Sequence, residues 1–238
     1  MSNIQIKNAV ADNVDEITTL YLKSVHTHFK ETLPDEELAM WKYENESQRF
    51  MNTELAIELR EMAERDQQLL QELFETGELP SAKYHPQMRA LHESNTSALK
   101  EIIRKYGWPG ISLVGAEGAE SAWLIAQHAV SDTKFMSDCI ELLKIAKAAG
   151  DVEGWQLAFL EDRVRTMSGK DQIYGTQFNV DEEGWPIPCP ITEPETVNER
   201  RKALGLNSLE ERLEEMRERE RQRRTQQSAT KALQRKSR

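Results

Sequence analysis

Apolar residues recur at intervals of three and four along most of the chain, and this spacing is typical of amphipathic helices. Five successive stretches show it, and Gly or Pro residues such as Gly107, Pro109 and Gly150 stand between several of them as stop signals. The pattern predicts a mainly α fold with an antiparallel helix cluster over residues 50–168. The buried stripe of the first long helix is expected to comprise Leu55, Leu59, Met62, Leu69, Leu70, Leu73 and Phe74.

The periodicity stops after residue 168. Residues 169–195 read as a long irregular segment, followed by a short helix around "ETVNERRKALG" and a charged helix "SLEERLEEMRERERQRR". At the other end, "IQIKNA" alternates as a short strand would and precedes two helical stretches. We therefore predict an N-terminal strand–helix–helix appendage over residues 1–45, a helical domain over 46–206, and a charged C-terminal helix with a basic tail over 207–238.

Charge is distributed unevenly along the chain. The net charge is -10, yet residues 221–238 contain seven Lys and Arg residues and no acid, so the remainder carries -17. An acidic body argues against nucleic acid as the main partner, and the basic tail is the only candidate for such binding. No stretch reaches the roughly 20 apolar residues of a membrane span. Without a signal-peptide pattern, and with two Cys residues in different contexts, the expected location is the cytoplasm.

Polar residues in apolar settings mark the candidate site. The stretch "AWLIAQHAVSD" places Gln127 and His128 at the end of an apolar helix, and Asp162 lies in another helix flanked by apolar residues. An Asp that accepts a hydrogen bond from an imidazole orients the ring and raises its basicity, as a general base requires. We therefore predict His128 and Asp162 as a catalytic pair. Further binding residues are expected at Asp66, Gln67, Gln127, Arg163, Tyr174, Gln177 and Arg201.

The same residues also fit a purely structural network, because buried polar side chains in helical bundles commonly satisfy one another. Both interpretations stay open at this point. A metal site is not predicted, because the chain has no HExxH or CxxC spacing. If a metal were bound, the ligands would come from His85, His92, His128, Asp66 and Asp162.

The segment from "IQIKNAVADN" to "ELAMW", residues 4–41, resembles the opening strand and two helices of a GNAT-type N-acetyltransferase. In that family these helices border the acceptor substrate. Acetyl-CoA is held there by backbone amides of a Gly-rich turn at a helix N-terminus, and this chain lacks that motif. The resemblance therefore implies a degenerate fragment, and we expect neither acetyl-CoA nor another cofactor to bind.

Residues of about 50–225 resemble a bacterial domain family of unknown function. The matching pieces occur in order: "RDQ", "GWP", "AWLIAQHA", "EDRV", "QIYGTQ" and "NERRKALGL". The resemblance implies no reaction. Three functions remain open: a helical module whose polar network forms a small-molecule pocket, a hydrolase or transferase that uses His128 and Asp162 as a base, and a degenerate N-acetyltransferase. The oligomeric state is not predicted.

Overall fold

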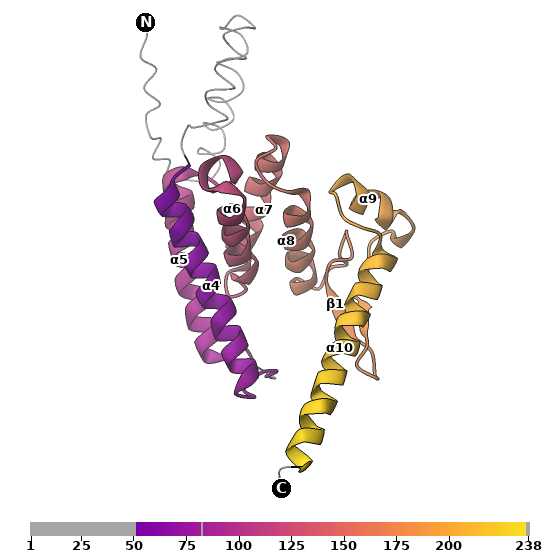
Figure 1. The fold of residues 1–238 in the computed structure, drawn as a ribbon. Helices are drawn as coiled ribbons and strands as arrows, with labels where there is room; N and C mark the ends of the chain where they lie inside the picture. The colour runs from indigo at the N-terminus through magenta and orange to yellow at the C-terminus, as the bar shows by residue number, and fades with distance from the viewer. Residues whose placement is uncertain (1–50, 82, 237–238) are drawn as a thin grey trace, which may run out of the picture. The chain divides into compact units, whose positions relative to one another are not determined.

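A computed structural model describes residues 51–81 and 83–236, with side chains described as far as residue 225. Within this range the chain is mainly helical with a small two-stranded sheet, which confirms the predicted fold class. It divides into two compact units, one ending at Val152 and the other beginning at Glu153 (Figure 1). The predicted appendage over residues 1–45 lies outside the described residues.

Among its described residues, the first unit contains four helices: α4 (Thr53–Glu75), α5 (Pro86–Tyr106), α6 (Ile111–His128) and α7 (Thr133–Ala148). Local chemistry sets their ends. The side chain of Asn52 accepts from Leu55 N at 3.0 Å to cap α4, and Asp132 caps α7 by accepting from Phe135 N at 3.0 Å. Gly107 ends α5 at φ 76°, a backbone conformation that favours glycine.

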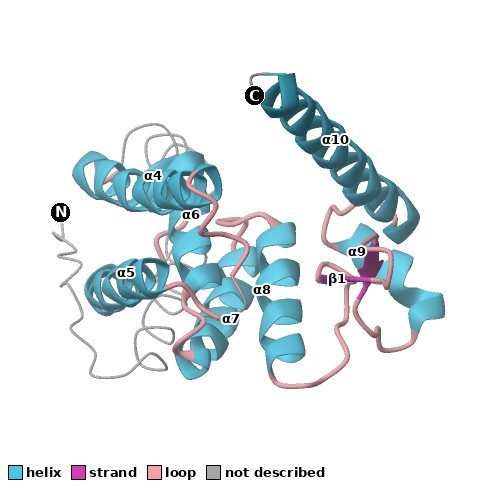
Figure 2. Cartoon of the chain, turned by 90° about the horizontal axis from the view of Figure 1, so that it is seen from below, coloured by secondary structure: helices cyan, strands magenta, loops and turns pink. Residues whose placement is uncertain are grey.

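The contacts between helices give their directions. Along α4 and α6, Asn52 N donates to Leu113 O at 2.7 Å and Asp66 lies beside His128, so the two helices run parallel. Between α4 and α5, the side chain of Asn95 reaches Met62 O, and His92 lies beside Asp66, so these two run antiparallel. Figure 2 shows α4, α5 and α6 grouped in the first unit. The expected cluster thus contains one parallel pair.

The pair α4 and α6 has the most extensive helix–helix contact of the described residues because small side chains face each other there. A Cβ at Gly118 would lie 3.5 Å from the backbone of Ala56, so the two helix backbones approach closely. The core around this contact is well buried, with Leu59 and Leu99 at 0% exposure and Ile125 at 1%. Close packing holds the polar residues of these helices in defined positions.

The second unit contains α8 (Gly154–Met167), β1 (Phe178–Val180), β2 (Pro186–Pro188), the 3-10 helix η2 (Pro194–Thr196), α9 (Val197–Ala203) and α10 (Leu209–Lys236). The strands pair antiparallel, with Phe178 opposite Pro188. The segment expected to be irregular, residues 169–195, therefore contains a small hairpin.

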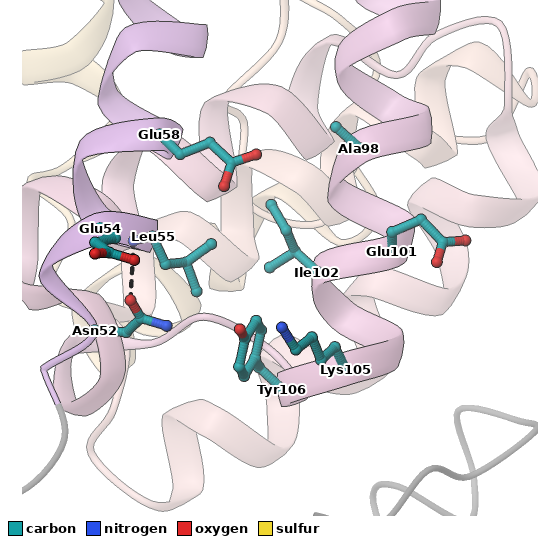
Figure 3. Close-up of a pocket in the computed structure, with 9 residues that line it drawn as sticks. All are labelled: Asn52, Glu54, Leu55, Glu58, Ala98, Glu101, Ile102, Lys105 and Tyr106. Atoms are coloured by element: carbon teal, nitrogen blue, oxygen red, sulfur yellow. Dashed lines mark hydrogen bonds between the residues drawn. The ribbon is translucent and has the colours of Figure 1, made fainter.

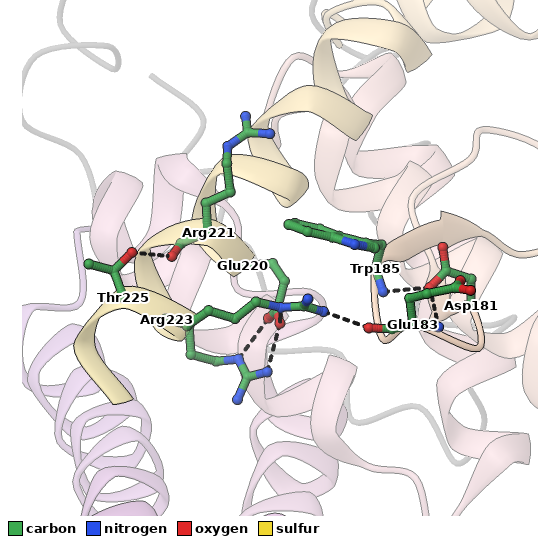
Figure 4. A network of polar contacts seen from close by, with 8 residues as sticks. Asp181, Glu183, Trp185, Glu220, Arg221, Arg223 and Thr225 are labelled. Atoms are coloured by element: carbon green, nitrogen blue, oxygen red, sulfur yellow. Dashed lines mark hydrogen bonds and ion pairs between the residues drawn. The ribbon is translucent and has the colours of Figure 1, made fainter. Parts of the chain in front are cut away.

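A polar network joins α10 to this hairpin (Figure 4). The guanidinium of Arg224 lies over the Trp185 ring, 4.0 Å from its centroid, and donates to Glu183 O at 2.9 Å. Glu220 accepts from Arg224 at 2.6 Å and from Arg223 at 2.7 Å. The charged helix predicted near the C-terminus is thus attached to its unit through cation–π and ion-pair contacts.

None of the helices in the described residues is both long and apolar enough to cross a membrane.

Candidate metal centre

Asp66 lies in the core of the first unit. The buried residues of α4 include Leu59, Met62 and Ala63, and Asp66 follows them at helical spacing on the same apolar face. Its side chain is 1% exposed. A carboxylate in such a position needs polar partners, because an ionised group without them costs several kcal/mol to bury.

Two histidines from neighbouring helices supply these partners. His128, the last residue of α6, places Nδ1 2.7 Å from Asp66 Oδ2. His92, in the first half of α5, places Nε2 2.9 Å from the same oxygen. The two imidazole centroids are 4.8 Å apart and the rings are tilted by 36°. Three helices thus direct one oxygen and two nitrogens toward one small region.

The histidines also decide the ionisation of the carboxyl group. Burial acts to raise the pKa of Asp66, but the hydrogen bond and charge of His128, together with the nearby His92, outweigh it and hold the pKa well below its ordinary value. Asp66 is therefore ionised at neutral pH. The centre holds one negative charge between two imidazoles.

His92 is held at its other nitrogen too. The Tyr84 hydroxyl lies within hydrogen-bond distance of His92 Nδ1. By contrast, the buried His92 Nε2 makes no well-aligned hydrogen bond within the described part of the chain, although Asp66 Oδ2 is only 2.9 Å away. The close oxygen is therefore off the direction in which Nε2 would donate or accept.

The donor set fits a divalent transition metal. Two imidazole nitrogens and one carboxylate oxygen are ligands that Zn²⁺ and Fe²⁺ take in catalytic centres. The three atoms all lie within 4.8 Å of one another. Around a tetrahedral zinc ion such donors are about 3.3 Å apart, given metal–ligand distances of 2.0–2.2 Å. Binding of the ion would require the carboxylate oxygen to move about half an ångström away from each nitrogen.

Access to the cluster comes from the side of His128. The side chain of His128 is 20% exposed, whereas those of His92 and Asp66 are 9% and 1% exposed. The amide of Gln67 donates to the second Asp66 oxygen, Oδ1, at 3.3 Å, and Gln127 is buried beside His128 in the chain. A ligand reaching the cluster from solvent therefore meets His128 first.

His128 and Asp162 make their contacts in different units, and their catalytic pairing stays a prediction. The partner of His128 is Asp66, and Asp162 is occupied by its own loop. Asp162 is 0% exposed and accepts from Ile173 N at 2.6 Å and Tyr174 N at 3.0 Å. It also accepts from the backbone and hydroxyl of Thr176, both at 3.0 Å.

Three other predicted residues of the second unit, Tyr174, Gln177 and Arg201, join Asp162 in this loop network. The amide of Gln177 donates to Thr176 Oγ1 at 3.1 Å, and the Thr176 hydroxyl in turn donates to Asp162. Arg201 is 1% exposed and donates to Tyr174 O at 2.6 Å and to Asn207 O at 2.6 Å. Burial and the charges of Glu161 and Asp162 raise the pKa of Tyr174 to about 12. Arg163, on α8, is partly exposed.

This second network is directed mainly at backbone groups, and its side chains hold residues 172–177 in place. The fully buried Gln172, which was not singled out from the sequence, belongs to it by donating to Gln177 O and Cys189 O at 3.0 and 2.9 Å. The cue that could have indicated Gln172 is its place at the start of "QIYGTQ". The predicted site residues thus belong to two networks, one within each unit.

A surface pocket of about 330 Å³ opens between the start of α4 and the end of α5 (Figure 3). Glu54 and Glu58 line it from α4, and Glu101, Lys105 and Tyr106 line it from α5. The Lys105 ammonium lies over the Tyr106 ring, 4.7 Å from its centroid. None of the predicted site residues lines this pocket.

The residues named from the sequence as possible metal ligands do not all lie together. Asp66, His92 and His128 come together, while His85 lies in the loop before α5 and pairs with Glu78 at 3.2 Å. Burial raises the pKa of the Cys139 thiol, so without a metal it stays protonated at neutral pH. His92 was the ligand that the binding-site prediction left out. Its place on the buried face of α5, four residues after Met88, is the signal that could have identified it.

Comparison with known proteins gives a family but no activity. No curated protein and no solved structure is significantly similar to the chain. The N-acetyltransferase-like pattern of residues 4–41 lies outside the matched region. Residues 53–220, which include the three ligand candidates and every piece of the second sequence resemblance, match a family of unknown function (DUF6624), and the chain belongs to that family.

Proposed function

We propose that this domain binds a divalent transition-metal ion through Asp66, His92 and His128 and uses it for hydrolytic chemistry on a small molecule. One observation carries the proposal. Asp66 Oδ2 lies within 3 Å of His128 Nδ1 and His92 Nε2, at 2.7 and 2.9 Å, and the buried His92 Nε2 has no aligned hydrogen bond among the described residues.

Three protein ligands suit a catalytic centre better than a structural one. Structural zinc sites are closed by four protein ligands, whereas catalytic sites keep a position for water or substrate. A bound Zn²⁺ lowers the pKa of a coordinated water to about 7 and polarises carbonyl or phosphoryl groups. The partly exposed His128 leaves one side of the cluster accessible to a small molecule.

A metal-free base is the second candidate. His128 and Asp66 form an imidazole–carboxylate pair at 2.7 Å, and the imidazole is partly exposed. In this alternative Asp66 takes the role that the sequence suggested for Asp162, and orients His128 as a general base. It predicts activity that survives a chelator, whereas the metal proposal predicts activity that a chelator abolishes and Zn²⁺ restores.

Isothermal titration of chelator-treated full-length protein with Zn²⁺ tests the proposal. We expect one equivalent to bind, and the variants Asp66→Asn and His128→Asn to bind at least 100-fold more weakly. His85→Asn is the matched control, because His85 lies outside the cluster, and it should bind as the wild type does. Circular dichroism verifies that each variant is folded. His128→Asn serves if the fully buried Asp66→Asn does not fold.

Two results would overturn the proposal. One is a wild-type protein that binds none of Zn²⁺, Co²⁺ and Fe²⁺ at micromolar concentrations. The other is equal binding by wild type, Asp66→Asn and His128→Asn. If Co²⁺ binds, its visible absorption reports the coordination number, and a four-coordinate spectrum supports three protein ligands with one exchangeable position. A screen of chromogenic esters and phosphodiesters with the metal-loaded protein then tests for hydrolysis.

We infer the remaining features of function from composition. The acidic body, with -17 outside residues 221–238, favours a small-molecule substrate over nucleic acid. A cytoplasmic location stays a prediction, and the N-acetyltransferase alternative stays a prediction about residues 4–41. Titration with acetyl-CoA should give no heat at micromolar concentrations, and binding there would revive that alternative.

A further inference from the structure

Tyr84 connects the loop before α5 to the candidate metal centre. Its hydroxyl contacts Nδ1 of His92, and the two rings lie 5.8 Å apart, tilted by 41°. The opposite ring nitrogen, Nε2, faces Asp66. Tyr84 therefore touches the side of the imidazole that would not bind a metal.

The tautomer of His92 decides whether this histidine can act as a ligand. A neutral imidazole carries its proton on one nitrogen and offers a lone pair on the other. If Nε2 carried the proton, a well-aligned hydrogen bond to the carboxylate 2.9 Å away would be expected, and none is formed. If Nδ1 carries it, Nδ1 donates to the Tyr84 oxygen and the lone pair of Nε2 is free for a metal.

The phenol is itself held in place. Arg89 precedes His92 by three residues, so both lie on one side of α5. The Arg89 guanidinium lies over the Tyr84 ring, 5.6 Å from its centroid. Tyr84 is thus fixed at its ring by one residue of α5 and at its hydroxyl by another.

We infer that Tyr84 is a positioning residue of the metal centre, which accepts the Nδ1 proton of His92 and thereby presents the Nε2 lone pair to a metal ion. This inference rests on the proposed function. Such partners of metal-bound histidines orient the ring and set its tautomer, and their loss weakens metal binding by about 10–100-fold. The effect passes through His92, because Tyr84 itself is not a ligand.

The variant Tyr84→Phe removes only the hydroxyl. Tyr106→Phe is its matched control, because Tyr106 is equally exposed at 36% and also has a cation over its ring, that of Lys105 at 4.7 Å, but is not paired with a histidine ring. We expect Tyr84→Phe to bind Zn²⁺ about 10–100-fold more weakly in titration calorimetry and Tyr106→Phe to bind as the wild type does.

The tautomer itself is read without metal. In ¹⁵N-labelled, metal-free protein at pH 8, two-bond NMR correlations of the His92 ring should show the proton on Nδ1 in wild type and in Tyr106→Phe. In Tyr84→Phe the ring should shift toward the Nε2-protonated form. A purely structural tyrosine would leave this signature unchanged.

The two readouts separate the inference from the proposed function. A wild-type His92 protonated on Nε2, or a tautomer unchanged in Tyr84→Phe, overturns the role of Tyr84 even if Zn²⁺ binds. Equal Zn²⁺ affinity in Tyr84→Phe and wild type overturns it as well. Failure of the wild type to bind any metal removes the proposed function, while the tautomer measurement still reports whether Tyr84 fixes the ring.

Discussion

Replacing Asp162 by alanine removes the group that holds residues 173–176. In the structure its carboxylate accepts three backbone N–H groups and one hydroxyl at 2.6–3.0 Å and is 0% exposed. The alanine side chain has no acceptor for these donors. The prediction therefore concerns stability: Asp162→Ala should destabilise the second unit and leave metal binding by the first unit unchanged.

The size of the effect follows from the donors that lose their acceptor. An unsatisfied buried donor costs about 1–3 kcal/mol. The backbone N–H of Thr176, a residue 5% exposed, should cost the most. The partly buried N–H groups of Ile173 and Tyr174 cost about 1 kcal/mol each, because water reaches them more easily. The Thr176 hydroxyl can rotate toward another partner, so no further cost is counted for it. The total is about 3–5 kcal/mol.

Hydrogen exchange resolved by peptide, measured against urea concentration, tests this estimate in the second unit. With a slope near 2 kcal/mol per molar urea, the midpoint should fall by about 2 M and the amides of residues 172–177 should lose protection. Asp171→Ala is the control: it removes the same charge from an exposed position of the loop and should change stability by less than about 0.5 kcal/mol.

The reasoning would be refuted by an Asp162→Ala protein with wild-type midpoint and wild-type protection of residues 172–177. Loss of Zn²⁺ binding with retained stability would be equally damaging, because it would give Asp162 the catalytic role first predicted for it.

Two further predictions concern the second unit. Gly175→Ala should destabilise it by about 1–3 kcal/mol, because Gly175 has φ +68° and an added Cβ would lie 2.7 Å from Leu209 Cδ1. Gly205 has φ +73° and nothing within 4 Å of an added Cβ, so Gly205→Ala measures the backbone cost alone. Its free energy of unfolding should fall by less in the same urea experiment. Hydrogen bonds from Arg223 and Arg224 lower the pKa of Glu220 to about 2. The ionised Glu220 therefore stabilises the contact of α10 with the hairpin fully above the unfolded pKa of about 4.3, and this stabilisation is lost as the pH falls toward 2. Trp185 fluorescence should follow this loss in wild type and not in Glu220→Gln, and superimposable pH profiles would contradict the assignment.

The helices could be predicted because their signals are local. The apolar spacing and the stop at Gly107 each act within one or two turns, and both features recur in the structure. The parallel course of α4 and α6 has no local signal. It depends on the close approach at Gly118 and Ala56, two small residues about sixty positions apart whose pairing only the folded chain defines.

Two of the three residues of the candidate centre, Asp66 and His128, were predictable as site residues, whereas their contact was not. His128 and Asp66 stood out because each is a polar side chain beside apolar ones, which a sequence displays directly. A sequence does not show which of the two carboxylates, Asp66 or Asp162, contacts His128. The backbone N–H groups of residues 173–176 that surround Asp162 are invisible in a sequence because every residue except proline has one.

The nature of the partners separates the two buried aspartates. Asp162 faces backbone amides, which cannot change protonation and leave no room for another ligand, so the network ends in a fixed loop. Asp66 faces two imidazoles, each of which can release a proton and offer a lone pair to a metal. A buried carboxylate that accepts hydrogen bonds from backbone amides holds a loop in place, whereas one that lies beside two imidazoles can still take part in binding a metal ion. Chemistry in this domain is therefore to be sought at Asp66, His92 and His128.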